Sequence, residues 1–344
     1  MSANRTIRAV VAASLTFGLA QAALAQGKLN LYCTANEEWC KAMSDEFARR
    51  TGVDVAYTRK GTGETYAQIK AEKENPKGDI WWGGTGDPHL QAAEERLTTR
   101  YEATGLKELL PWAKAQWDRS QGRVVGIYMG AIGFVYNREL LARKGIAPPA
   151  CWSDLLKPEF KGEIQMSNPY SSGTAYTVIA TLVQLMGEDK AFAYLKQLHG
   201  SVNQYTKQGP APGQAAARGE TMIAITFLHD GAMNKKRGFP VEGVAPCEGT
   251  GYEIGSMSII DGARNMVNAK KFYEFALSVE GQKMAEKGES FQAPSNAGTP
   301  PSPYSPDLSK IKLIDYDFAK YGSGAERRRL LAKWDAETKV GAPK

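Results

Sequence analysis

Two pairs of polar side chains near the ends of predicted strands could bind a polyhydroxylated ligand. His229 and Asp230 directly follow an apolar, strand-like segment, and Glu248 and Glu253 come after the next predicted strand. An imidazole and several carboxylates can form multiple strong hydrogen bonds to the vicinal hydroxyls of a sugar. His229 and Asp230 could also act as a general acid and base, although no nucleophile accompanies them in the sequence.

A run of small and hydroxyl side chains could bind an anion. Ser171, Ser172, Gly173 and Thr174 lie between a predicted strand and the start of a predicted helix. Backbone N–H groups and hydroxyls at a helix N-terminus form a favourable site for phosphate or carboxylate. The same run could instead cap the helix without any ligand. Polar recognition at one end and an anion site at the other predict a polyhydroxylated phosphate as ligand.

The common catalytic signatures are absent from the sequence. It contains no G-x-x-x-x-G-K-[ST], no G-x-S-x-G, no H-E-x-x-H and no G-x-G-x-x-G. We therefore predict a binding protein without catalytic residues or a cofactor. A periplasmic enzyme that processes a sugar phosphate through His229 and Asp230 is the alternative from another functional class.

The elements that must position these residues alternate between short strands and amphipathic helices, which is typical of α/β proteins. The chain has 344 residues, 42% of them hydrophobic and 23% charged, as in an ordinary globular protein, and this length favours two lobes. The predicted strands are 29–33, 53–57, 79–82, 124–128, 132–137, 163–166, 221–227, 241–245 and 254–260, and the predicted helices include 37–51, 65–74, 152–156, 268–277, 280–287 and 326–339.

The chain crosses between the predicted lobes at the strands around residue 130 and near 260. We expect lobe 1 to comprise residues 26–130 and 261–310, and lobe 2 to comprise residues 131–260 and 311–344.

The first 25 residues have the form of a secretory signal peptide. Arg5 and Arg8 precede an apolar run from Ala9 to Ala20, and small residues follow it. We expect export to the periplasm and a mature chain that begins at Gln26. Loss of these two arginines from the 43 basic residues, against 37 acidic ones, lowers the net charge from +6 to +4. That charge gives little support to nucleic-acid binding.

The four cysteines all lie in the mature chain, and an even number in an oxidising compartment indicates disulfides. Three connectivities are possible, of which we favour Cys33 with Cys40 and Cys151 with Cys247. Buried free thiols are the alternative. The spacings do not fit a zinc site, so no metal is predicted.

Three tryptophans could stack on a sugar face. Trp39, Trp81 and Trp82 lie near predicted strand ends. Because neighbours on a strand alternate between its faces, either Trp81 or Trp82 must face the core.

The ordered series of these segments resembles the periplasmic solute-binding proteins of the ferric-iron type, the extracellular components of ABC importers. The resemblance covers nearly the whole mature chain. It implies an α/β fold of the type II periplasmic binding proteins, with two lobes, each a mixed sheet flanked by helices, joined by a hinge of crossing strands around a ligand cleft. The matching segments are 29–33, 47 with 51–53, 61–64, 71–72, 79–84, 136–137, 152–156, 160–162, 172–176 and 219–220.

One departure from the ferric-ion binders concerns their metal-binding tyrosines. Those proteins place two adjacent tyrosines where this sequence has His229 and Asp230, and a histidine with one carboxylate is a poor substitute for phenolates on Fe(III). The sequence is instead similar to the branch that binds hexose phosphates, and ferric-iron binding is the alternative. The resemblance assigns His229, Asp230 and Glu253, ahead of Glu248, to the sugar hydroxyls, and it assigns Thr34, Gly63, Thr85, Ser172, Gly173 and Thr174 to the phosphate.

The resulting expectation is a monomeric periplasmic protein that captures a sugar phosphate or a similar organophosphate. It would deliver the ligand to an inner-membrane ABC permease with its ATPase, through closure of the lobes around the ligand. Presentation of the ligand to a sensor kinase is an alternative. We also expect the affinity to depend on pH between 5 and 8 through His229.

Overall fold

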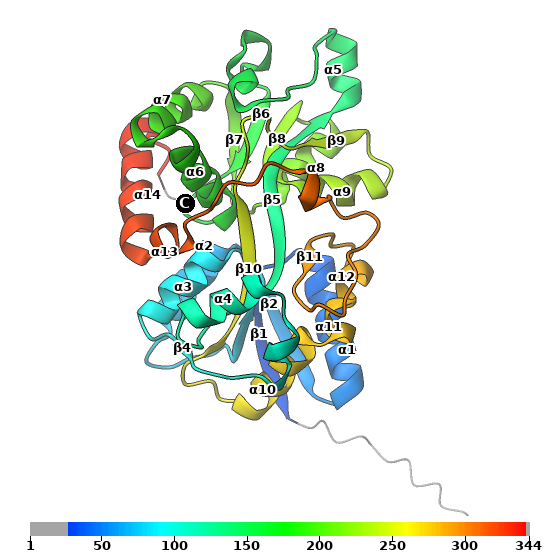
Figure 1. The fold of residues 1–344 in the computed structure, drawn as a ribbon, viewed down its shortest axis with the longest axis vertical. Helices are drawn as coiled ribbons and strands as arrows, with labels where there is room; N and C mark the ends of the chain where they lie inside the picture. The colour runs from blue at the N-terminus through cyan, green and yellow to red at the C-terminus, as the bar shows by residue number, and fades with distance from the viewer. Residues whose placement is uncertain (1–26, 342–344) are drawn as a thin grey trace, which may run out of the picture.

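A computed structural model describes residues 27–341, and Figure 1 shows two stacked lobes connected by long strands. The predicted signal peptide, residues 1–25, lies outside the described residues. Within residues 27–341, no helix is long and apolar enough to cross a membrane.

The lower lobe in Figure 1 begins with three parallel strands that follow the predicted pattern. Its first helix coincides with the predicted range, with acidic residues in the first turn, basic residues in the last turn and Gly52 in the left-handed conformation at its C-cap. The elements are β1 (Lys28–Cys33), α1 (Glu37–Thr51), β2 (Asp54–Arg59), α2 (Thr62–Ala71), β3 (Ile80–Trp82), α3 (Gly86–Glu94), β4 (Thr98–Thr99), η1 (Thr104–Glu108) and α4 (Pro111–Arg119).

Two long strands connect the lobes. The predicted strands 124–128 and 132–137 are one continuous strand, β5 (Val125–Asn137), because residues 129–131 stay extended and paired with β10. It pairs in antiparallel fashion with β10 (Tyr252–Ile260) and then with β8 (Ile223–Phe227) of the upper lobe. The sheet order is β2-β1-β3-β10-β5-β8-β6-β7.

The upper lobe surrounds the second half of this sheet (Figure 1). Here the predicted segment 152–156 is a 3-10 helix. The elements are α5 (Arg138–Lys144), η2 (Trp152–Leu156), η3 (Pro158–Phe160), β6 (Ile164–Ser167), α6 (Gly173–Met186), α7 (Glu188–His199), β7 (Val202–Thr206), α8 (Ala211–Arg218), β8, α9 (Leu228–Lys236) and β9 (Val241–Val244).

The chain then returns to the lower lobe and ends on the upper one. The predicted helix 280–287 is two short helices. The elements are α10 (Met266–Leu277), α11 (Val279–Gln282), α12 (Met284–Lys287), β11 (Ala293–Pro294), η4 (Leu308–Lys310), α13 (Phe318–Tyr321) and α14 (Gly324–Thr338). Helix α14 packs on α6 and α7 and also touches α3 of the lower lobe.

Two large hydrophobic clusters form the cores. One contains Leu29, Phe47, Phe272 and other residues of the lower lobe, and the other runs from Ile132 to Trp334 in the upper lobe and the C-terminal helix. The bounds that the sequence suggests for the two lobes stay a prediction, and the boundary at 130 and 131 falls inside β5.

Trp81 and Trp82 do not stack on a ligand. Both are buried, Trp81 against His89 at a centroid distance of 3.6 Å and Trp82 against Trp39 at 4.8 Å. The strand neighbours Trp81 and Trp82 are both buried because helices cover both faces of this parallel part of the sheet, so neither is exposed for stacking on a sugar. Trp39 is buried in the same core.

The structure forms both of the disulfides that the sequence favours, Cys33–Cys40 and Cys151–Cys247. The first joins the end of β1 to the first turn of α1. The second closes a loop with a sequence separation of 96 residues.

Candidate ligand-binding site

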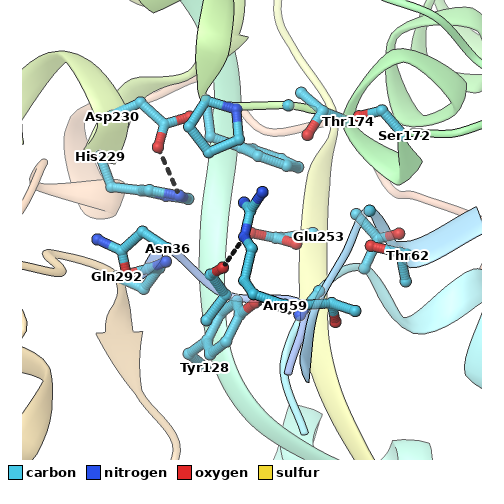
Figure 2. A pocket seen from close by; sticks show the side chains of 18 residues that line it. Asn36, Arg59, Thr62, Tyr128, Ser172, Thr174, His229, Asp230, Glu253 and Gln292 are labelled. Atoms are coloured by element: carbon cyan, nitrogen blue, oxygen red, sulfur yellow. Dashed lines mark hydrogen bonds and ion pairs between the residues drawn. The ribbon is translucent and has the colours of Figure 1, made fainter. Parts of the chain in front are cut away.

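A pocket between the lobes collects most of the predicted site residues (Figure 2). Its walls come from the loops after β1, β2 and β3, from the N-termini of α6 and α9, and from the crossing strands β5 and β10. This is where ligands bind in open α/β sheets, beyond the carboxyl ends of the strands. Seven of the ten predicted residues line it: Thr34, Thr85, Ser172, Thr174, His229, Asp230 and Glu253.

His229 is fixed in the pocket wall by packing. Its ring stacks on Phe227 at a centroid distance of 5.3 Å and an interplanar angle of 12°. A Cβ atom on Gly130 would lie 2.6 Å from its Nδ1 atom, so only glycine leaves room for the ring. Burial lowers the pKa of His229, and the ring is therefore neutral at pH 7. A neutral imidazole offers one donor and one acceptor.

Asp230 and Glu253 place two buried carboxyl groups beside this ring. Asp230 accepts a hydrogen bond of 2.6 Å from the Thr226 hydroxyl, and its Oδ1 atom lies 3.8 Å from Nε2 of His229. It lies in the first turn of α9, where the helix dipole favours negative charge. Burial raises the pKa of Glu253 well above its ordinary value, and the nearby Asp230 charge adds to this effect.

Arg59 is a pocket residue that the sequence reasoning missed. It is the last residue of β2 and the only Lys or Arg among the pocket-lining residues. Its Nε atom donates a hydrogen bond of 2.9 Å to the Ala35 carbonyl, and Figure 2 shows the guanidinium beside Glu253. Burial lowers the pKa of Arg59 below its ordinary value, yet a guanidinium stays charged at pH 7. The predicted strand 53–57 stopped short of this residue, so its place at a strand end was not recognised.

Hydroxyl groups form the opposite wall. In Figure 2, Thr62, Ser172 and Thr174 lie across the pocket from His229 and Asp230. Thr85 and Ser172 are the N-cap residues of α3 and α6, and neither side chain caps its helix. The first backbone N–H groups of both helices lack intrahelical partners, so this wall is suited to an anion. Thr62, like Arg59, was not predicted.

Three of the predicted residues do not line the pocket. Gly63 donates its N–H to the Ser171 carbonyl at 3.1 Å, which joins the loop after β2 to the upper lobe. At Gly173, a Cβ atom would lie 1.8 Å from the Thr85 hydroxyl, so glycine allows the N-termini of α3 and α6 to lie close together.

Glu248 is the third, and it lies at the Cys151–Cys247 disulfide. Its carboxylate accepts hydrogen bonds from the backbone N–H groups of Trp152 at 2.8 Å and Ser153 at 3.1 Å. The expectation that Glu248 is an acidic partner of the ligand is therefore corrected: it caps a 3-10 helix.

Asn36, Tyr128 and Gln292 complete the polar lining, and no sequence motif marked them. Tyr128 accepts a hydrogen bond of 2.7 Å from the N–H of Gly84. Burial raises the pKa of Tyr128 well above its ordinary value, so the phenol keeps its proton. Asn36, the residue before α1, presents a buried side-chain oxygen without a hydrogen-bond partner.

One group of potential metal ligands occurs among residues 27–341, formed by Cys151, Cys247 and Glu248. The two sulfurs are joined as a disulfide and are not thiolates. This group does not fit a metal site.

Comparisons with known proteins identify the family of this chain. A model of the bacterial extracellular solute-binding proteins matches residues 80–321. The chain belongs to this family. A relative from Haemophilus influenzae without a described function is 46% identical over 344 residues, which is 99% of both chains. The family expected from the sequence is confirmed.

Three solved structures share the whole fold. The periplasmic binding protein AfuA from Actinobacillus pleuropneumoniae, with exogenous fructose-6-phosphate bound, is 48% identical with a TM-score of 0.89, and it covers 92% of this chain and 100% of its own. The periplasmic binding protein P5PA is 43% identical with a TM-score of 0.88 over 91% of this chain and 100% of its own. Iron-bound HitA from Pseudomonas aeruginosa is 20% identical with a TM-score of 0.75 over 92% of this chain and 99% of its own, a likeness in fold. The two-lobed type II fold is thus confirmed.

Proposed function

We propose that this protein captures a sugar phosphate, with a hexose phosphate as the favoured ligand, in the pocket between its lobes. The observation that carries the proposal is the division of the pocket into two chemically different walls. A histidine and carboxyl groups lie on one side, hydroxyls and two helix N-termini lie on the other, and Arg59 lies between them.

The phosphate is assigned to the wall of hydroxyls. The N-termini of α3 and α6 supply unpaired backbone N–H groups, and Thr62, Ser172 and Thr174 supply hydroxyl donors. Arg59 adds a charge-assisted, planar set of donors that suits phosphate oxygens. We assign Thr34 and Thr85 to the phosphate as well.

The sugar hydroxyls are assigned to His229, Asp230 and Glu253. Asp230 can only accept hydrogen bonds when ionised, whereas neutral His229 can donate one and accept one. The raised pKa of Glu253 favours a protonated carboxyl group, which also donates and accepts. A set of donors and acceptors of this kind matches vicinal hydroxyls, each of which is both. The solved relative with fructose-6-phosphate bound supports a hexose phosphate as the class of ligand.

The mechanism we propose is closure of the lobes around the ligand. Both lobes contribute to the pocket, so a bound ligand favours the closed arrangement over an open one. We further propose that the protein acts in the periplasm and delivers its ligand to an inner-membrane ABC permease, as membership of the solute-binding family supports. No catalytic step is part of this proposal.

A thermal-shift screen of residues 26–344 tests the ligand class, because a ligand that binds only the native state raises its melting temperature. The panel is fructose 6-phosphate, glucose 6-phosphate, the free sugars, inorganic phosphate, an aminoalkyl phosphonate and ferric citrate. We expect the largest shift with a hexose phosphate, and a much smaller shift in Asp230→Asn. A shift with the phosphonate or ferric citrate alone would overturn the proposed ligand, and release of inorganic phosphate would show an enzyme.

A further inference from the structure

One arginine of the C-terminal helix α14 is buried where the two lobes meet. Arg327 lies in the first turns of α14, and its side chain is only 6% exposed. It forms an ion pair with Asp87, whose side chain is 11% exposed. Asp87 belongs to the first turn of α3 in the lower lobe, two residues after the pocket residue Thr85.

The same guanidinium also contacts residues next to the N-terminus of α6, on the upper-lobe side of the pocket. Its Nη2 atom donates a hydrogen bond of 3.2 Å to the Pro169 carbonyl, in the loop that leads to Ser172. Its Cζ atom lies 4.4 Å from the centre of the Tyr176 ring, in the first turns of α6. One buried side chain therefore contacts both helix starts that form the proposed phosphate end, α3 from one lobe and α6 from the other.

We propose that Arg327 is a positioning residue that assembles the phosphate end of the pocket, by holding the N-termini of α3 and α6 at the spacing one anion requires. It does not line the pocket itself. The inference rests on the proposed function and extends it to a residue that lies 74 positions beyond Glu253, the last of the predicted site residues.

The buried pair suits this role because its two halves come from different lobes. A buried charge that loses its partner is strongly unfavourable, so Asp87 and Arg327 favour the arrangement in which they meet. The planar guanidinium offers its donors to the carboxylate and the carbonyl in a fixed fork while its face lies over an aromatic ring, a geometry that the compact ammonium of lysine reproduces only in part. Separation of α3 from α6 would break at least one of these contacts.

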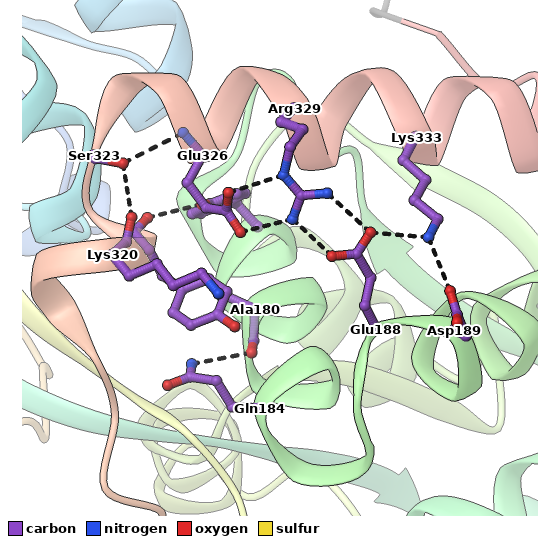
Figure 3. A network of polar contacts seen from close by, with 11 residues as sticks. Ala180, Gln184, Glu188, Asp189, Lys320, Ser323, Glu326, Arg329 and Lys333 are labelled. Carbon is purple, nitrogen blue, oxygen red and sulfur yellow. Dashed lines mark hydrogen bonds and ion pairs between the residues drawn. The ribbon is translucent and has the colours of Figure 1, made fainter.

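Arg329 offers a matched control on the same helix. It forms ion pairs with Glu188 at 2.7 Å and Glu326 at 2.8 Å, and Lys333 joins Glu188 at 2.9 Å (Figure 3). This network connects α14 to α7 within the upper lobe and touches neither helix start of the pocket. Arg327→Gln and Arg329→Gln remove the same charge, two residues apart.

The binding test compares these variants in calorimetric titrations with fructose 6-phosphate. We expect at least a tenfold loss of affinity in Arg327→Gln, less than a twofold loss in Arg329→Gln and partial recovery in Arg327→Lys. The double variant Asp87→Asn with Arg327→Gln is expected to lose less binding free energy for fructose 6-phosphate than the two single variants lose in sum. Equal affinities of Arg327→Gln and Arg329→Gln for the ligand would refute the positioning role.

A second measurement, on the ligand-free protein, separates this inference from the proposed function. Amide hydrogen exchange is expected to rise in Arg327→Gln at residues 85–89 and at 171–176, and to stay unchanged there in Arg329→Gln. If wild type fails to bind fructose 6-phosphate, the proposed function fails while this measurement still decides the role of Arg327. Unchanged exchange at both segments would overturn the inference, whatever the ligand.

Discussion

Replacement of Arg59 by glutamine is expected to weaken binding of a sugar phosphate without affecting a free sugar. The Nε atom of Arg59 already donates to the Ala35 carbonyl, which leaves the terminal N–H groups for the pocket. A hydrogen bond to a charged group contributes about 1.5–3 kcal/mol. At about 1.4 kcal/mol per factor of ten, loss of one such bond corresponds to a decrease in affinity of about 10- to 150-fold.

The neighbouring Lys60 provides the control for this prediction. Lys60 bonds to Gln68 at 2.6 Å and does not line the pocket, so Lys60→Gln removes the same charge outside the site. Isothermal titration calorimetry with fructose 6-phosphate and with fructose would measure both variants against wild type, together with their ligand-free melting temperatures. Equal losses in the two variants would show a general electrostatic effect and refute the assignment of Arg59. A parallel loss for fructose would place the arginine at the sugar instead.

The remaining predictions concern pH, packing and the corrected acidic residue. Burial lowers the pKa of His89 from 6.5 to about 3, so the unfolded chain binds more protons than the folded chain below pH 6.5. The free energy of unfolding, measured by urea titration, is therefore expected to fall as the pH falls from 6.5 towards 3. This residue contributes up to about 1.4 kcal/mol per pH unit, and the fall should be less steep in His89→Gln. Burial lowers the pKa of His229, so the dependence of affinity on pH that the sequence suggests between pH 5 and 8 is now expected only at the acidic end of that range. The affinity is expected to be constant between pH 7 and 8, and a midpoint near pH 7.5 would contradict this. Gly130→Ala forces the His229 ring to move, and we expect it to lower the free energy of unfolding by about 1–3 kcal/mol and to remove most of the ligand affinity. Gly105→Ala is the control, because its Cβ atom would lie 3.8 Å from the nearest atom, and it should leave the ligand affinity unchanged. Glu248→Gln is expected to lower the melting temperature while the dissociation constant stays the same, and a weaker affinity would restore Glu248 to the site.

Much of the fold could be predicted because local signals agree with the tertiary structure. Helix α1 matches its predicted bounds since its apolar face, its charged ends and Gly52 indicate the same element. The break expected at residues 129–131, within β5, was wrong, because the glycines of this run suit turns as well as strands. In the structure they give space to other elements, for example Gly130 to His229 and Gly133 to Leu228.

The candidate site could be predicted only where its residues follow recognisable strand ends. His229 and Asp230 directly follow β8, and Ser172 and Thr174 begin α6, so sequence order placed them well. Glu248 resembled its neighbour Glu253, but the register of β10 brings only Glu253 to the pocket. Arg327 lies in the C-terminal helix, far along the chain from every predicted site residue, and only the packing of α14 against α3 reveals its contacts.

The central claim is that one pocket binds a sugar phosphate with its phosphate at the hydroxyl wall. A crystal structure of the protein with fructose 6-phosphate tests this most directly. We expect the phosphate group between the N-termini of α3 and α6, with its oxygens within hydrogen-bond distance of Arg59, and the sugar hydroxyls within hydrogen-bond distance of His229, Asp230 and Glu253. A phosphate bound beside His229 and Asp230, or a ligand outside this pocket, would contradict it.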